Sequence, residues 1–374
     1  MKPKARKTFP VILIILCITL FIISIIQHFG YSSDVLIPTF SSLETNENEV
    51  IKSSTRCPIC NFTPLYPPTS TRRDVVLAAA LTGFKRVEYF LRTLRTTGSR
   101  ARVILFLDSS TAASDDWLRF FSSCDIEPVY VNYTSQVLHD APKLSRYYFY
   151  KQWLERHIDE VDRVLHTDTF DVIFQSDPFL DIIPNDKLYF TFEPTDLYHS
   201  RWTGSWITTC YGIQFFNQYA RSPVSCSGVT AGGAKTFLKY IDLLINTPVW
   251  NQCFGHSYDQ AHHNYLLYTG EFEKNGIEIL SMDCNSPYLT MHFCCKKAKC
   301  NWTTGVIYGN NSQKAPVLIH QYNRWKELIN RNSVMCPAPN KNVLKLVSSD
   351  EIPAKIEYLP PVEGNLPEKI AQES

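Results

Sequence analysis

The chain carries an uncharged apolar run, VILIILCITLFIISII, over residues 11–26. The flanking residues extend this run towards the length of about 20 residues that a bilayer core requires. A cleaved signal peptide is the competing interpretation, but its apolar stretch is shorter and ends in small residues, and IIQHFGYSS offers neither feature. We therefore predict a transmembrane signal anchor over residues 9–29.

The charges around this run predict its orientation. Four basic residues precede residue 10, and the first acidic residue is Asp34. Because cytoplasmic flanks carry the excess of lysine and arginine, residues 1–8 are expected in the cytoplasm and the bulk of the chain in a lumen. A short span also suits the thinner membranes of the early secretory pathway. The sequence thus predicts a single-pass type II protein of the Golgi or ER membrane.

Glycosylation signals and cysteines agree with a luminal body. The predicted N-glycosylation sites are Asn61, Asn132, Asn301 and Asn310, each of which begins an Asn-x-Ser/Thr triplet. Of the 12 cysteines, only Cys17 lies in the apolar run, which leaves eleven in a compartment where disulfides are the default. Because eleven is odd, at least one of them is free or pairs between chains.

Two groups of cysteines also have metal-like spacing. They are the pair Cys57 and Cys60, and the group Cys294, Cys295 and Cys300. A strong zinc signal needs a second C-x-x-C pair at the usual separation, and the sequence has none. We therefore interpret both groups as disulfide cysteines.

Charge balance and missing motifs disfavour several functional classes. The 37 basic and 36 acidic residues nearly cancel, so the chain lacks the basic surface that nucleic-acid binding requires. No Gly-x-Gly-x-x-Gly follows the first predicted strand, and the chain has no P-loop motif and no Gly-x-Ser-x-Gly. Dinucleotide oxidoreductases, P-loop nucleotidases and α/β-hydrolases are therefore disfavoured.

Composition divides the remaining chain into three parts. Residues 30–73 are polar and turn-rich, as in a luminal stem, and residues 348–374 form a polar tail without apolar periodicity. Between them, residues 74–347 alternate apolar runs with helically spaced segments. The predicted strands include residues 75–81, 103–107, 129–131 and 161–165. This alternation predicts an α/β head with a mixed, mostly parallel sheet flanked by helices, whose ligands bind at the carboxyl ends of the strands.

The most informative stretch is DRVLHTDTFDVIFQSDPF, residues 162–179. An apolar strand ends at Asp168, and Asp171 follows three residues later. Two carboxylates at the carboxyl end of a strand form an oxygen-rich site that suits Mg²⁺ or Mn²⁺. Acids at strand ends also cap turns, and spacing alone does not separate the two roles.

The string TDxxDVIFQSDPF resembles the metal-binding strand end of nucleotide-diphospho-sugar glycosyltransferases with the GT-A fold, and the resemblance extends over residues 74–335. In that family a DxD-type motif holds a divalent cation against the sugar nucleotide. Here His166 stands at the first acidic position of the triplet, so Asp171 is expected to serve in its place. The resemblance implies a GT-A fold for the head.

The resemblance also implies a cation site made by Asp168, Asp171 and His320. His320 ends a short apolar strand at residues 317–319, and in related transferases a C-terminal histidine completes the site. Two carboxylates and an imidazole suit Mn²⁺ or Mg²⁺. A structural role for His320 is the alternative.

Further positions of the family match substrate-binding residues. Arg146 corresponds to a position that faces the nucleotide, although an ordinary ion pair is an equal alternative. The segment SGVTAGG precedes a predicted helix, and its Ser227, Gly228 and Gly232 are expected to approach the donor, unless the segment is only a glycine-rich turn.

The acceptor side of the resemblance is a DQ motif. Asp259 and Gln260 are the expected catalytic residues, with Asp259 orienting hydroxyls of the transferred sugar or, alternatively, capping a helix. Asn264 is a further expected substrate-binding residue. Glu193 and Trp206 fall in the middle of the resemblance, and Trp206 is interpreted as core packing.

The resemblance predicts a metal-dependent glycosyltransferase that moves a sugar from a nucleoside diphosphate sugar, with a UDP-sugar favoured, to a hydroxyl of a glycan, protein or lipid acceptor, and it favours retention. The alternative is a catalytically inactive, membrane-tethered protein that binds nucleotide sugars or glycans, which His166 would explain. A disulfide-rich adhesion ectodomain is a third possibility, but the alternation of strands and helices disfavours it.

Overall fold

A computed structural model describes residues 57–111, 113–256, 258–290, 294, 299–301, 303–308, 315–338, 344 and 356–362. The predicted cytoplasmic tail (1–8), the predicted anchor (9–29) and Asn310 lie outside these residues. Within the described part of the chain, no helix combines the length and the apolar character that crossing a bilayer requires.

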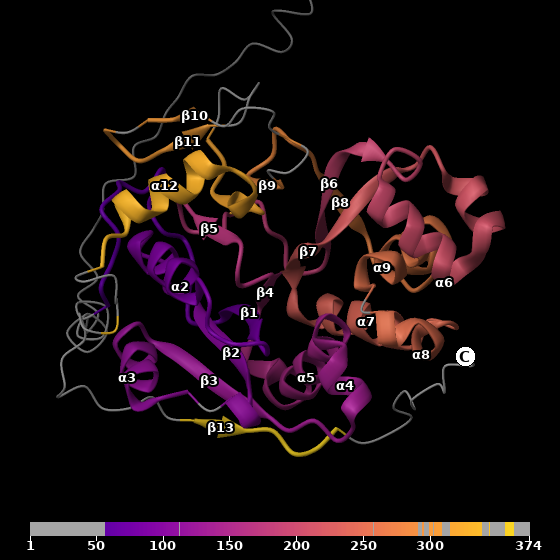
Figure 1. Ribbon diagram of the computed structural model, residues 1–374, viewed down its shortest axis with the longest axis horizontal. Helices are drawn as coiled ribbons and strands as arrows, with labels where there is room; N and C mark the ends of the chain where they lie inside the picture. Colours follow the sequence, from indigo (N-terminus) through magenta and orange to yellow (C-terminus); the bar gives the residue numbers. More distant parts are fainter. Residues whose placement is uncertain are drawn as a thin grey trace, which may run out of the picture. The chain divides into compact units, whose positions relative to one another are not determined.

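The apolar strands predicted from the sequence form the centre of an eight-stranded sheet (Figure 1). In spatial order its strands are β13 (Glu357–Tyr358), β3 (Ile126–Val131), β2 (Arg102–Asp108), β1 (Asp74–Ala80), β4 (Arg163–Thr167), β7 (Pro223–Gly233), β6 (Leu188–Asp196) and β8 (Ile279–Met282). Neighbouring strands from β13 to β4 are parallel, β7 is antiparallel to β4 and β6, and β8 is parallel to β6. The sheet is therefore mixed and mostly parallel, as predicted.

Two smaller sheets accompany the large one. β12 (Leu318–His320) lies between β5 (Val172–Phe174), to which it is antiparallel, and β9 (Tyr288–Thr290), to which it is parallel. β10 (Lys299–Cys300) and β11 (Ile307–Tyr308) form an antiparallel pair. The sheet of β5, β12 and β9 matters for the site, because it brings the end of β12 beside the chain that leaves β4.

Helices cover both faces of the large sheet. The described α-helices are α2 (Val87–Thr96), α3 (Asp115–Ser123), α4 (Gln136–Asp140), α5 (Pro142–His157), α6 (Arg201–Tyr219), α7 (Ala234–Ile245), α8 (Trp250–Cys253), α9 (Asp259–Tyr268), α10 (Glu271–Lys274) and α12 (Lys326–Met335). Val75 and Leu77 of β1 share a buried core with α5 and α7. Val76 and Ala78 share the opposite core with α2 and α3, and Figure 1 shows these helix pairs on either side of β1 and β2. Because both faces are covered, the interiors of β1 and β2 are apolar.

The glycine-rich segment 227–233 is a strand rather than a turn, because it forms the second half of β7. The helix predicted after it is α7, which begins at the next residue. A Cβ atom on Gly232 would lie 2.0 Å from the backbone oxygen of Lys187, and one on Gly233 would lie 1.8 Å from that of Asn185. These two glycines therefore permit the close approach of the chain that enters β6.

Part of the predicted stem is attached to the head. Residues 57–73 lie within the predicted range 30–73, and they include two disulfide-bonded cysteines. The carboxylate of Asp177 accepts hydrogen bonds from the backbone N–H groups of Thr69 and Ser70, at 2.9 and 2.7 Å. Packing against the head thus begins well before residue 73.

Part of the polar tail is also attached to the head. β13 extends the sheet beside β3, and Leu359 and Val362 are buried in the core that contains α5. The indole of Trp153 donates a hydrogen bond to Glu357 at 3.2 Å. Within the range 348–374, residues 356–362 therefore belong to the folded unit.

The interpretation of the cysteines as disulfide-forming is confirmed for the described pairs. The disulfides are Cys57–Cys124, Cys60–Cys336, Cys210–Cys253 and Cys284–Cys294. Cys57 and Cys60 each bond a distant cysteine and not each other, so they do not form a metal-binding pair. Cys226 is free and buried, as the odd number of cysteines allows.

Candidate functional site

A pocket of about 380 Å³ lies at the carboxyl ends of β1 and β4. Residues of β7, α5, α9 and the end of β12 complete its wall. The polar and aromatic lining residues are Thr82, Lys143, Arg146, Asp168, Thr169, Phe170, Asp171, Trp206, Cys226, Ser227, Asp259, Gln260, His320, Gln321 and Arg324. The pocket therefore lies at the edge of the sheet where the sequence predicts ligands.

Strand pairing brings the three predicted cation ligands together. The backbone N–H of Asp168, immediately after β4, donates to the oxygen of Gly228 in β7 at 2.9 Å. His320 pairs with Val172 across the antiparallel strands β12 and β5, which places it beside Asp171. One ligand atom from each of Asp168, Asp171 and His320 lies within 4.8 Å of the other two. A single ion can therefore contact all three side chains.

The donor atoms of this group suit a hard divalent cation. Nε2 of His320 lies 3.3 Å from Oδ2 of Asp168 and 3.6 Å from Oδ1 of Asp171. This nitrogen is buried and lacks a well-formed hydrogen bond, and such atoms are rare in folded proteins unless they have a function. Two carboxylate oxygens and one imidazole nitrogen fit Mn²⁺ or Mg²⁺.

Gly228 leaves the space in which these ligands meet. A Cβ atom on this residue would lie 2.5 Å from Cε1 of His320 and 2.9 Å from Oδ2 of Asp168. Any larger residue would displace one of the two side chains, because real Cβ atoms do not approach other atoms so closely. Gly228 lines the pocket, so its predicted place near a ligand agrees with the structure.

The two carboxyl groups have opposite pKa shifts. Burial opposes the ionisation of Asp168, but the charge of Arg146 outweighs it and holds the pKa of this carboxyl below its usual range. Burial raises the pKa of Asp171. Because metal ligands bind in their deprotonated form, a bound cation would favour the carboxylate of Asp171 and the neutral imidazole of His320.

Arg146 connects the cation site to the predicted acceptor-side motif. Its guanidinium donates to Asp168 at 2.5 Å and to Asp259 at 2.7 Å, and the side chain is almost fully buried. Arg146 thus forms an ion pair and lines the pocket at the same time. Asp259 is the first residue of α9, and Tyr258 is the N-cap, so the alternative role of Asp259 as an N-cap is wrong. At this position the helix dipole stabilises its negative charge.

Of three further predicted residues, two line the pocket and the third, Asn264, has a structural role. Ser227 and Gln260 line the pocket, and Gln260 donates to the hydroxyl of Thr203 at 2.8 Å. Asn264 is fully buried, and its amide bonds the backbone N–H and C=O of Ser225 at 2.9 and 2.7 Å. Asn264 therefore holds α9 to β7 and is not brought to the pocket.

Gly232 is likewise apart from the pocket, since it pairs with Val164 and Leu188 inside the large sheet. His166 is fully buried in β4 and contacts the rings of Tyr147 and Tyr150. It faces the core and not the cation site. Burial keeps the pKa of His166 well below its usual value, so its imidazole is neutral at neutral pH.

Several lining residues did not emerge from the sequence. Lys143 lies three residues before Arg146 on α5, so helical spacing places both on one face. Arg324 lies four residues after His320, but no sequence pattern marks it as a pocket residue. Trp206 is half-buried and packs against the buried cluster of Leu197, Ile207, Val224 and Ala261, which agrees with its interpretation as core packing, and it also lines the pocket.

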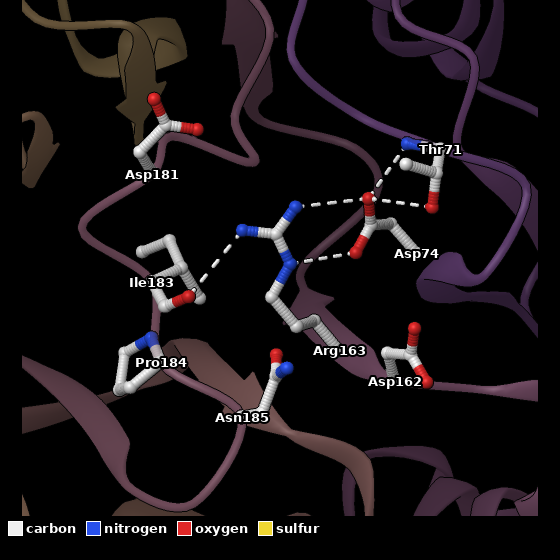
Figure 2. A pocket seen from close by; sticks show the side chains of 8 residues that line it. All are labelled: Thr71, Asp74, Asp162, Arg163, Asp181, Ile183, Pro184 and Asn185. Atoms are coloured by element: carbon white, nitrogen blue, oxygen red, sulfur yellow. Dashed lines mark hydrogen bonds and ion pairs between the residues drawn. The ribbon is translucent and has the colours of Figure 1, made fainter.

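A second cavity, of about 400 Å³, lies at the opposite edge of the sheet (Figure 2). Figure 2 shows Arg163, the first residue of β4, directed at Asp74, the first residue of β1. The two side chains form paired hydrogen bonds of 2.7 and 2.9 Å. Since these charges neutralise each other, this cavity presents a structural ion pair and offers less to a ligand than the pocket at the carboxyl ends.

The predicted glycosylation sites that the structure describes are accessible. Asn61, Asn132 and Asn301 are exposed. An exposed asparagine permits glycan attachment, and glycosylation at these residues stays a prediction.

Comparison with known proteins adds no family to this geometry: the chain matches no protein-family model and no curated protein sequence.

Proposed function

We propose that the protein is a divalent-metal-dependent glycosyltransferase with a GT-A fold, which uses a nucleoside diphosphate sugar, with a UDP-sugar favoured, as donor. The observation that carries the proposal is the meeting of Asp168, Asp171 and His320 within 4.8 Å at the carboxyl end of β4. The same three residues were expected from the resemblance of the sequence to that family. The mixed, mostly parallel sheet is compatible with the fold.

Some residues of the pocket would bind the diphosphate, and others position the side chains that would bind the sugar. When bound, a divalent cation supplies the positive charge that neutralises a diphosphate leaving group. Lys143 and Arg324 line the same pocket and add positive charge for phosphate oxygens. Arg146 fixes the carboxylates of Asp168 and Asp259 relative to each other, so that Asp259 and Gln260 are held where they can bind hydroxyls of the transferred sugar.

The alternative function, binding of nucleotide sugars or glycans without transfer, rested on His166 in place of an acid. His166 lies in the core, and Asp171 is the second carboxylate of the group. This arrangement removes the reason for preferring the alternative. Membrane anchoring, a Golgi or ER location and retention of configuration remain predictions from the sequence.

Sugar-nucleotide hydrolysis tests the proposal. Full-length protein is incubated with a panel of sugar nucleotides, with and without Mn²⁺, and released nucleotide is measured. We expect Mn²⁺-dependent release with at least one donor, and its loss in Asp168→Asn. Asp181→Asn, an exposed acid in the cavity of Figure 2, is the matched control and should retain release. Undiminished release by Asp168→Asn would reject the site.

A further inference from the structure

A smaller cavity adjoins the cation pocket. Its volume is about 300 Å³, at the lower end of the range for small-molecule sites. It shares Lys143, Trp206, Gln260, Gln321 and Arg324 with the cation pocket. Its own lining residues are Glu193, Ser200, Trp202 and Thr203. A molecule in this cavity therefore lies directly beside one in the cation pocket.

Glu193 is an unusual residue in this wall. It belongs to β6 and is only 5% exposed, yet within the described residues its carboxyl group has no hydrogen bond and no ion pair. Burial raises the pKa of Glu193 to about 7. The oxygens of Glu193 are not among the enclosed side-chain atoms, and the residue lines the cavity, so its carboxyl group is available to accept a hydrogen bond from a ligand there.

Two tryptophans from the start of α6, Trp202 and Trp206, also line the cavity. Trp202 is 68% exposed, the most exposed of the large apolar residues in the described chain. Trp206 stacks on Tyr258, with ring centroids 5.3 Å apart, and is held in place by that contact. Flat, accessible indole rings offer an apolar face to the C–H side of a sugar ring.

The charge and size of the cavity restrict its ligand. Glu193 is the one ionisable residue among those that line only the smaller cavity, and it accepts hydrogen bonds from hydroxyl groups, whereas Lys143 and Arg324 are shared with the cation pocket. A cavity of this volume suits one or two sugar rings rather than a nucleotide. Aromatic rings beside a hydrogen-bonding carboxyl group are a combination that fits a neutral glycoside.

We propose that the Glu193–Trp202 cavity binds the acceptor, as a neutral saccharide whose hydroxyl donates a hydrogen bond to Glu193 and whose ring packs on Trp202. The role of the saccharide as acceptor rests on the proposed function, because the donor would lie in the adjoining cation pocket. The binding itself involves only residues of the smaller cavity and requires no cation.

Saturation-transfer NMR on the full-length protein tests this proposal. The probes are methyl β-D-galactopyranoside, methyl α-D-glucopyranoside and methyl α-D-mannopyranoside, without cation or sugar nucleotide. We expect transfer to at least one of them, and a loss of affinity of roughly tenfold in Trp202→Ala. Tyr198→Ala is the control, because Tyr198 is also an exposed aromatic but does not line the cavity. Glu193→Gln should weaken the same probe, since an amide is a poorer acceptor than a carboxylate.

The outcomes separate this inference from the proposed function. Absence of saturation transfer to every probe, or equal affinities of Trp202→Ala and Tyr198→Ala, would overturn the inference while nucleotide release continues to support the enzyme. If the protein shows saturation transfer to a saccharide but hydrolyses no sugar nucleotide, the cavity is a saccharide-binding site, and its role as an acceptor site is overturned. Thermal unfolding of each variant verifies that the fold is intact.

Discussion

At the scale of single residues, Gly228 decides whether the cation ligands can meet. It lies opposite Asp168 in the pairing of β4 with β7, and its missing side chain leaves the space that His320 occupies. His320 is itself buried at the wall of the pocket. A residue without a side chain is therefore needed at position 228 so that His320 and Asp168 can approach each other.

Replacing Gly228 with alanine should weaken cation binding. The added Cβ would lie 2.5 Å from Cε1 of His320, so the imidazole or Asp168 must shift away from the shared position. We expect Mn²⁺ affinity, measured by calorimetry, to fall by roughly tenfold to a hundredfold. Gly255→Ala is the control, because nothing lies within 4 Å of its Cβ position. Equal Mn²⁺ affinities of the two variants would show that the ligands do not share an ion here.

The buried carboxyl group of Glu193 should make stability depend on pH. Burial raises its pKa from 4.5 to about 7, so between these values the folded chain holds a proton that the unfolded chain has released. The free energy of unfolding therefore falls as pH rises through this window, by about 3 kcal/mol in total from this group. Denaturation by urea without added cation, at pH 5 and pH 8, measures the change.

Glu193→Gln removes the titrating group and keeps its shape. The free energy of unfolding should therefore differ less between pH 5 and pH 8 in Glu193→Gln than in the unaltered protein, by about 3 kcal/mol. The variant should also be the more stable protein at pH 8. Glu278→Gln, at the surface, is the matched control. A pH dependence that Glu193→Gln leaves unchanged would mean that the carboxyl group is solvated.

At the scale of elements, the apolar strands were predictable and β7 was not. β1 and β2 contain long apolar runs because helices cover both faces, and such runs are visible in a sequence. The second half of β7 contains Gly228, Gly232 and Gly233, and glycine normally marks a turn. Here the glycines are required by neighbouring backbone and side chains, which only the tertiary structure reveals.

Asn264 connects two elements, and its replacement should lower stability. Its amide bonds both backbone groups of Ser225 and so ties α9 to β7. Asn264→Ala leaves these groups buried and unpaired, and we expect a loss of about 3 kcal/mol in the free energy of unfolding, measured with urea.

Asn275→Ala is the comparison, since Asn275 is exposed and caps a short helix with one bond to Glu271. Its effect should stay below about 1 kcal/mol. If Asn264→Ala were as stable as Asn275→Ala, then Asn264 would not have the structural role described here, and a place in substrate binding would again be open.

At the scale of the whole molecule, the sequence predicted the group of candidate cation ligands better than it predicted where the folded unit begins and ends. Asp168 directly follows β4, Asp171 directly precedes β5 and His320 ends β12, and the resemblance predicted that the three residues converge. The boundaries of the folded unit depend on contacts between residues that are far apart in the sequence. Cys60 bonds Cys336, and residues 356–362 extend the sheet, although neither segment has apolar periodicity. Such attachments are invisible to local patterns.

The lining of the two adjoining pockets was also beyond the sequence. Lys143, Glu193 and Arg324 come from α5, β6 and the turn after β12, and only the packing of these elements brings them to one surface. No spacing in the chain joins residues that lie on three separate elements. The resemblance includes Glu193 and Trp206, but it does not indicate that they line one cavity with Lys143 and Arg324.

The central claim is that Asp168, Asp171 and His320 hold one divalent ion. Pulsed electron paramagnetic resonance of the full-length protein with Mn²⁺ tests it most directly, because a coordinated imidazole gives a ¹⁴N coupling. We expect one bound Mn²⁺ per chain with this coupling, and the coupling should disappear in His320→Ala. Bound Mn²⁺ with no nitrogen coupling, or a coupling that persists in His320→Ala, would contradict the claim.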